Sequence, residues 1–192
     1  MNSTNLPPKL QPYQGVIYFI IMLLLSHFLW KFTVLGDDTD TAVTFFGIDI
    51  SAPFIYFSNL TATISVQILH FFGSTVELYN DNILRYTGSH TGVRVIWGCS
   101  GLKQAYIFLC IMLFHNGSFT KKLWYIPLSL LLLFGYNVLR ITLMTAAIKH
   151  HPEWFHFLHE YLFKYLYYGL LFGLYLHWDA KTEQPKTEST NN

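Results

Sequence analysis

The sequence predicts an all-α integral membrane protein: a helical bundle of four transmembrane helices, or five if residues 53–72 also cross, plus an outer amphipathic helix and a short β-hairpin. Of the 192 residues, 52% are hydrophobic, 18% are aromatic and 12% are charged. Average globular chains are about 25% charged, so this composition argues against an ordinary soluble domain. The aromatic content argues against a disordered chain. The apolar residues also gather in runs long enough to cross a bilayer.

Several function classes are disfavoured at once. The net charge of +1 provides no basic surface for nucleic acid. The two cysteines, Cys99 and Cys110, cannot form a disulfide framework. The sequence contains no Cys-x-x-Cys or His-Glu-x-x-His motif, and its histidine pairs lack helical zinc spacing. We therefore expect no metal centre, no cofactor and no nucleic-acid partner.

Four apolar runs account for the predicted spans, since a spanning helix needs roughly 20 mainly apolar residues. Residues 16–35 are interpreted as an uncleaved anchor, because no basic region precedes them and no small-x-small cleavage site follows. The runs 99–115, 123–147 and 154–178 are predicted to form a three-helix core, 99–178, which carries the candidate catalytic residues described below. Residues 179–192 are polar and predicted to be a disordered cytoplasmic tail. The whole chain, 1–192, is predicted to be a single membrane domain.

Residues 53–98 are predicted to lie outside, as an amphipathic helix followed by the hairpin. In residues 53–72, polar side chains recur every three or four positions, at Asn59, Thr63, Gln67 and His70. This pattern suits either a span whose polar face looks into a bundle or a helix in the membrane interface. Further along, apolar residues alternate on both sides of a turn-like segment at 87–90, which favours a β-hairpin.

The lysines orient the predicted spans. Lysines cluster before the first span, between the second and third spans, and in the tail, at Lys9, Lys121, Lys122, Lys181 and Lys186. Cytoplasmic segments carry an excess of such residues, so these three segments are expected on the cytoplasmic side. Residues 36–51 carry four aspartates and no lysine or arginine. Parity then favours an outer surface or re-entrant position for residues 53–72 over a fifth span.

Three chemically versatile side chains converge near the outer boundary of successive spans. Arg140 lies 18 residues after Lys122, and His159 lies 18 residues before His177, which is about 27 Å of helix in each case. Cys99 begins the span that ends near residue 115, about 24 Å away. A thiol, a guanidinium and an imidazole are therefore expected at similar depth.

The surroundings of each residue refine this choice. Cys99 lies between Gly98 and Ser100 at a predicted helix start, where free N–H groups and the helix dipole favour a thiolate. Cys110 lies in the middle of an apolar run and is interpreted as a core residue. A charge inside a span is usually functional or paired. Arg140 could alternatively extend to the lipid headgroups. Asn137, one turn earlier, could orient it or pair across helices.

The choice among histidines depends on a helix face. His150, His151, His156 and His159 crowd one region, and His156 is the main rival to His159. His159 shares a stripe with Gly169 and Gly173, a small-xxx-small pair that lets helices approach closely. This stripe is predicted to face the other helices, which would place His159 on the packed side of its helix.

Three motifs, in this order, resemble the exosortase/archaeosortase family of multi-pass membrane cysteine transpeptidases. They are Cys99-Ser100-Gly101-Leu102, Asn137-Val138-Leu139-Arg140-Ile141, and His159-Glu160 with Gly169 ten residues later. The likeness covers about residues 57–178. The chain departs from the family pattern at Trp97 and Gly98, where the family commonly has an acidic residue, and at Glu160, where aspartate is common.

The resemblance implies a sortase-like reaction. Cys99 would attack a peptide carbonyl and form a thioacyl-enzyme, Arg140 would stabilise the oxyanion, and His159 would transfer protons, with Asn137, Ser100 and Gly101 in supporting positions. The implied substrates are secreted proteins that carry a C-terminal motif, a hydrophobic helix and a basic cluster, and the acceptor would be a lipid or glycan. The implied location is the cell (inner) membrane, with the site on the outer side. Two alternatives stay open: a non-catalytic export subunit, and an intramembrane cysteine protease without transfer activity.

Overall fold

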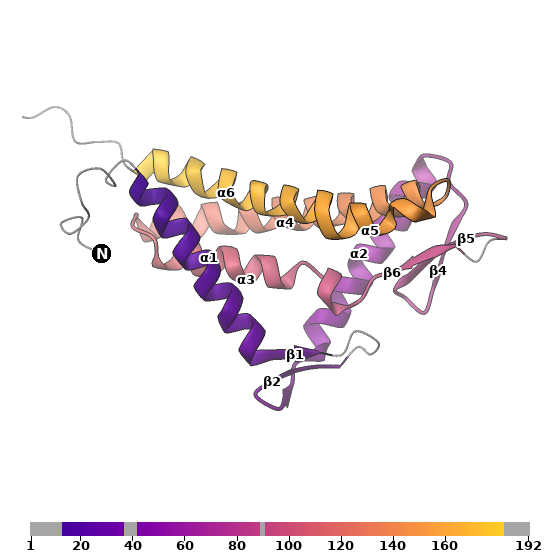
Figure 1. Ribbon diagram of the computed structural model, residues 1–192, viewed down its shortest axis with the longest axis horizontal. Coiled ribbons are helices and arrows are strands. Elements are labelled where there is room, and N and C mark those ends of the chain that lie inside the picture. The colour runs from indigo at the N-terminus through magenta and orange to yellow at the C-terminus, as the bar shows by residue number, and fades with distance from the viewer. Residues whose placement is uncertain (1–12, 37–41, 89–90, 183–192) are drawn as a thin grey trace, which may run out of the picture.

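The computed structural model describes residues 13–36, 42–88 and 91–182, which form helices and two small sheets (Figure 1). The five long helices are α1 Gln14–Thr33, α2 Ser51–Phe71, α3 Leu102–Phe114, α4 Phe119–Ile148 and α6 Phe163–Thr182. Short turns are the 3₁₀ helices η2 Trp97–Cys99 and η3 Pro152–Trp154, the single turn α5 Phe155–Phe157, and the π-helix η4 Leu158–Leu162. Two of the lysines used to predict the orientation, Lys9 and Lys186, lie outside the described residues.

A core of large side chains joins α1, α3, α4 and α6. It includes Phe19, Phe108, Leu133, Leu171 and Tyr175. The outer faces are apolar too, because Ile20, Leu24, Phe28 and Phe32 of α1 and Leu128, Leu131 and Leu139 of α4 are exposed. Exposed apolar surface on this scale suits contact with lipid rather than water. Within the described residues, α1, α2 and α4 are long and apolar enough to cross a membrane, so the chain is a helical membrane protein.

Two predicted segments have different bounds in the structure. The span expected at 99–115 is shorter, because Gly101 adopts a left-handed φ of 80° and α3 begins only at Leu102. Its 13 residues rise about 20 Å. The tail predicted to be disordered from residue 179 instead continues α6 to Thr182, and residues 183–192 lie outside the described part. The pairing of Asp179 with His115 stabilises that last turn.

The α2 helix packs with a face that the sequence pattern did not predict. Ser58, Thr61, Ala62 and Ser65 are buried, and α2 contacts α4. Small side chains let two helices approach closely in a membrane. The predicted polar stripe is not this packing face, because Gln67 and His70 are exposed and the other two members are half-buried. By length and composition α2 could cross a membrane, as the alternative in which residues 53–72 form a further span requires. It runs obliquely across one end of α4 (Figure 1).

Two three-stranded antiparallel sheets flank α2. The second sheet contains β4 Val76–Tyr79, β5 Ile83–Tyr86 and β6 Gly92–Arg94, and Leu84 faces Val93 across the predicted hairpin, which is confirmed. The first sheet contains β1 Val34–Gly36, β2 Val43–Phe45 and β3 Ile48–Asp49 and was not predicted. Strands of two or three residues are too short to give an alternating pattern.

The three segments that the lysines predict to be cytoplasmic adjoin helix ends that meet at one end of the molecule. His115 Nε2 lies 2.9 Å from Asp179 Oδ1, and the Tyr175 hydroxyl donates to the Gly15 carbonyl at 3.0 Å. The start of α1, the end of α3 and the end of α6 are therefore neighbours. Figure 1 shows β4, β5 and β6 at the opposite end.

Candidate active site

Cys99 lies in a tight turn that neighbouring groups hold in place. Its N–H donates to the Ile96 carbonyl at 2.8 Å, and its carbonyl accepts from Asn137 Nδ2 at 2.7 Å. The Ser100 hydroxyl accepts from the Leu102 N–H at 3.3 Å, at the start of α3. Gly101 closes the turn with its positive φ, which a side chain would make unfavourable. The three residues predicted to be supporting therefore shape the turn that presents Cys99.

Arg140 is buried near Cys99 on the face of α4 that also carries Asn137. Only 7% of Arg140 is exposed, so the side chain does not extend out to the headgroups. Within the described residues, nothing accepts a hydrogen bond from its guanidinium, and its Nε is fully buried. A buried charged donor without a partner is costly, and such groups gather where a ligand completes them. The guanidinium is therefore available to an incoming oxygen.

His159 links Cys99 to a carboxylate. Its Nε2 lies 4.0 Å from Cys99 Sγ, and its Nδ1 lies 2.9 Å from Glu160 Oε1. A carboxylate only accepts hydrogen bonds, so this contact favours the tautomer that carries its proton on Nδ1, in which Nε2 can accept the thiol proton. Phe155 stacks on the imidazole with ring centroids 5.6 Å apart. Glu160 thus orients the imidazole of His159, a role that the sequence analysis did not assign.

The helix face that was used to select His159 is not the packed face. Gly169 and Gly173 are exposed, and nothing lies within 4 Å of a Cβ placed on either glycine. The packed face of α6 instead carries Tyr167, Leu171 and Tyr175. His159 reaches the site because residues 158–162 form a π-turn. A π-turn holds one more residue than an α-turn, so it rotates the preceding residues relative to α6.

The rival residues lie elsewhere. The imidazole of His151 pairs with Glu153 on the surface, and His156 is exposed beside Tyr161. Neither these nor His150 lines the cavity described next. Cys110 is half-buried within α3 and is likewise absent from the cavity wall.

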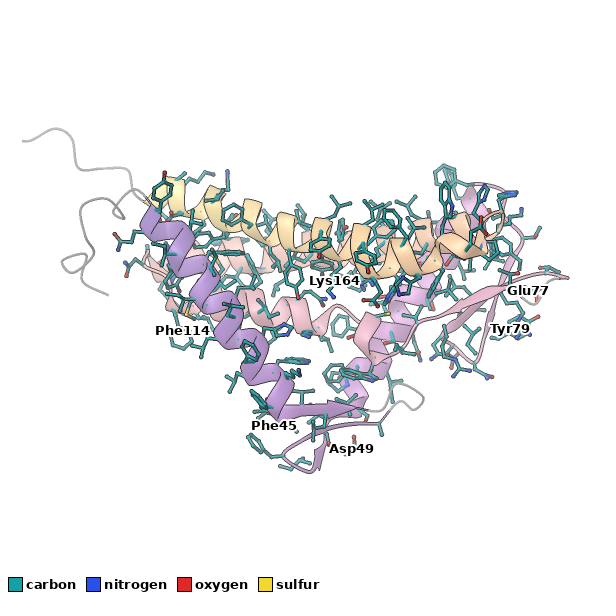
Figure 2. The ribbon with its side chains drawn as sticks, in the orientation of Figure 1. Phe45, Asp49, Glu77, Tyr79, Phe114 and Lys164 are labelled. Carbon is teal, nitrogen blue, oxygen red and sulfur yellow. The ribbon has the colours of Figure 1, made fainter. Side chains whose placement is uncertain are left out.

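A cavity of about 410 Å³ brings Cys99, Arg140 and His159 together. Its wall also carries three lysines that the sequence analysis did not select, Lys31 of α1, Lys103 of α3 and Lys164 of α6. Figure 2 labels Lys164 on the side of α6 that faces α3. The sequence did contain a signal for these lysines, because each of them interrupts a different apolar segment. A charged residue in such a segment is costly in a membrane and usually functional. Across the described ranges, no group of three or more His, Cys, Asp or Glu side chains could hold a metal ion.

Burial decides the resting state of the thiol. It raises the pKa of Cys99, and the charge of Glu160 adds to this rise, while the Arg140 charge and the hydrogen bond to Ile96 act in the opposite direction. The net change is upward, so the thiol rests protonated. The sequence prediction that a helix start favours the thiolate is therefore wrong, because Cys99 precedes α3 and is 8% exposed. A protonated thiol would need a base before it could attack a carbonyl, and His159 Nε2 lies 4.0 Å from it.

Comparison with known proteins adds an independent finding. A family model described as transmembrane exosortase matches residues 16–176, which include Cys99, Arg140 and His159. No curated protein and no solved structure matches the chain.

Proposed function

Because the chain belongs to the transmembrane exosortase family, we propose that it is a membrane cysteine transpeptidase. It cleaves the C-terminal sorting signals of secreted proteins at the outer face of the cell (inner) membrane and transfers the cleaved proteins to an acceptor. The observation that carries this proposal is a row of three side chains in one cavity. Cys99 Sγ lies 4.0 Å from His159 Nε2, and His159 Nδ1 lies 2.9 Å from Glu160 Oε1.

The first half-reaction forms a thioester. His159 Nε2 takes the thiol proton, and Cys99 Sγ attacks the carbonyl carbon of the scissile peptide, forming a C–S bond. The carbonyl electron pair moves to oxygen, and the unpaired Arg140 guanidinium donates to this oxyanion. Collapse of the intermediate breaks the C–N bond, and the leaving amine takes the proton from His159. The Glu160 carboxylate stabilises the imidazolium throughout.

The second half-reaction releases the product. An acceptor amine or hydroxyl loses a proton to His159 and attacks the thioester carbon. The C–S bond breaks, and Cys99 leaves as a thiolate that recovers the proton. Water in place of the acceptor gives a free carboxylate instead, which separates a protease from a transpeptidase.

The test compares the two cysteines in cells that also produce a secreted substrate with a C-terminal motif, hydrophobic helix and basic cluster. We expect Cys99→Ala to abolish processing and Cys110→Ala to leave it normal. The wild type should form a substrate adduct that hydroxylamine releases, as a thioester requires. Mass measurement of the product separates transfer from hydrolysis. Normal processing by the Cys99→Ala protein would support the non-catalytic alternative.

A further inference from the structure

Positive charge is concentrated in the cavity. Lys31, Lys103, Lys164 and Arg140 line it, and Glu160 is the one acidic residue in its described wall, so four cations and one anion give +3 with the histidines neutral. The charges of Lys31 and Lys164 both repel that of Lys103. The charges of all three lysines also interact with the imidazole of His27, another residue of the cavity wall. The three ammonium groups therefore share one electrostatic environment although they come from three helices.

The protein itself does little to neutralise this charge. Lys164 Nζ lies 3.8 Å from Glu160 Oε2, but Glu160 also holds His159. In the ranges that the structure describes, no acidic side chain pairs with Lys31 or Lys103. Unpaired charge is costly inside a membrane and usually functional. A bound anion would relieve the repulsion among the lysines.

Two of the three lysines are exposed and lie beside exposed aromatic residues in the sequence. Lys31 is exposed between Phe28 and Phe32 on α1, and both aromatic side chains are exposed. On the other side, Lys164 is exposed near Tyr165, which is 68% exposed. Tyrosine and lysine together are typical of helices at the level of the lipid headgroups. A ligand that stays anchored in the bilayer can therefore reach two of the three lysines.

We propose that Lys31, Lys103 and Lys164 hold the phosphate of a membrane lipid headgroup and that this lipid is the acceptor. The proposal rests on the transpeptidase function proposed above. A phosphate offers several oxygens, so it can accept from more than one ammonium at once. The headgroup amine or hydroxyl then lies in the same cavity as the Cys99 thioester. It gives its proton to His159, bonds to the carbonyl carbon, and displaces Cys99.

A binding experiment on the purified full-length protein tests the site directly. The probes are short-chain phosphatidylethanolamine, diacylglycerol with the same acyl chains, and inorganic phosphate. We expect phosphatidylethanolamine to bind about 10-fold or more tighter than either other probe. The triple variant Lys31→Gln, Lys103→Gln, Lys164→Gln should lose about 10- to 100-fold in affinity for it. The matched control, Lys121→Gln, changes an exposed lysine outside the cavity and should bind normally.

The other outcomes are equally decisive. Equal affinity for diacylglycerol, or undiminished binding by the triple variant, would overturn the proposal. Inorganic phosphate that binds as tightly as the lipid would identify a free-anion site rather than a lipid site. An acidic peptide that displaces the lipid from the wild type alone would assign the lysines to the peptide substrate. The single variants Lys31→Gln and Lys164→Gln, both at exposed positions, give the same readout if the triple variant fails to fold.

An activity measurement separates this proposal from the one on which it rests. Loss of acceptor binding should make the triple variant accumulate the hydroxylamine-sensitive Cys99 adduct while transfer falls about 10-fold or more. Processing that survives in Cys99→Ala would reject the transpeptidase, whatever the lipid does. Cys99-dependent cleavage without selective lipid binding would reject the lipid acceptor alone.

Discussion

At the scale of single residues, the unpaired guanidinium of Arg140 is the most informative feature of the site. A lysine could keep the charge there but not the planar donor geometry. We expect Arg140→Lys to lower the rate of substrate processing about 10²- to 10³-fold, the usual cost of losing an oxyanion donor. Pulse-chase measurement of the cleaved substrate checks this. Near-normal processing would leave Arg140 with a structural role.

Glu160 provides a second residue-scale prediction, as a positioning residue that acts through His159. Glu160→Gln keeps the size of the side chain but removes the negative charge that holds the imidazolium. We expect processing to fall about 10-fold or more and Glu160→Asp to restore part of it, since the carboxylate returns. The same cleavage assay measures both variants. Equal activity of the Gln and Asp variants would contradict a role for the carboxylate.

The histidine assignment can be tested in the same way. His159→Ala should abolish processing, because it removes the proposed base, whose Nε2 lies 4.0 Å from Cys99 Sγ. His156→Ala, one turn earlier on an exposed position, should process normally. Membrane expression of both variants is the control. Loss of processing in His156→Ala alone would move the proton-transfer role to that residue.

At the scale of elements, the π-turn at 158–162 determines where His159 points. Deleting Tyr161, an exposed residue of that turn, should convert it to an α-turn and rotate the preceding helix by about 100°. We expect the deletion to abolish processing while α6 keeps its packing, as measured by thermal stability in detergent. Tyr161→Ala, which keeps the residue count, is the matched control and should stay active. An active deletion protein would show that the π-turn is dispensable.

The elements also show what sequence pattern could and could not supply. Counting residues along helices placed Cys99, Arg140 and His159 at similar depth, and the structure does bring these three together in one cavity. The Gly169/Gly173 pair indicated the wrong packed face for α6, and the assumption of 3.6 residues per turn through residue 162 tied His159 to that face. The sequence pattern also missed the small-residue face of α2. A polarity pattern cannot reveal packing that depends on side-chain size.

At the scale of the whole molecule, the arrangement makes a topological prediction. The α3–α4 loop lies beside the end of α6, and β6 lies at the other end of the molecule (Figure 1). In a background of Cys99→Ala and Cys110→Ala, we expect Ser118→Cys to be labelled only from the cytoplasmic side. Arg94→Cys, on the exposed face of β6, should be labelled only from outside. A membrane-impermeant thiol reagent, applied to intact cells and to inverted vesicles, measures this. Labelling of both positions from one side would contradict the proposed orientation.

The burial of Cys99 also has a redox consequence. The proposed position of the site, on the outer side of the membrane, lies outside the reducing cytoplasm. In such an oxidising environment an accessible thiolate is readily oxidised to a sulfenic acid or a disulfide. A protonated, 8% exposed sulfur is a poor target for oxidants. The second cysteine is eleven residues further along the chain and outside the cavity, so no partner thiol is at hand for an internal disulfide. Keeping the thiol protonated until a substrate arrives would thus preserve the nucleophile without a dedicated reductant.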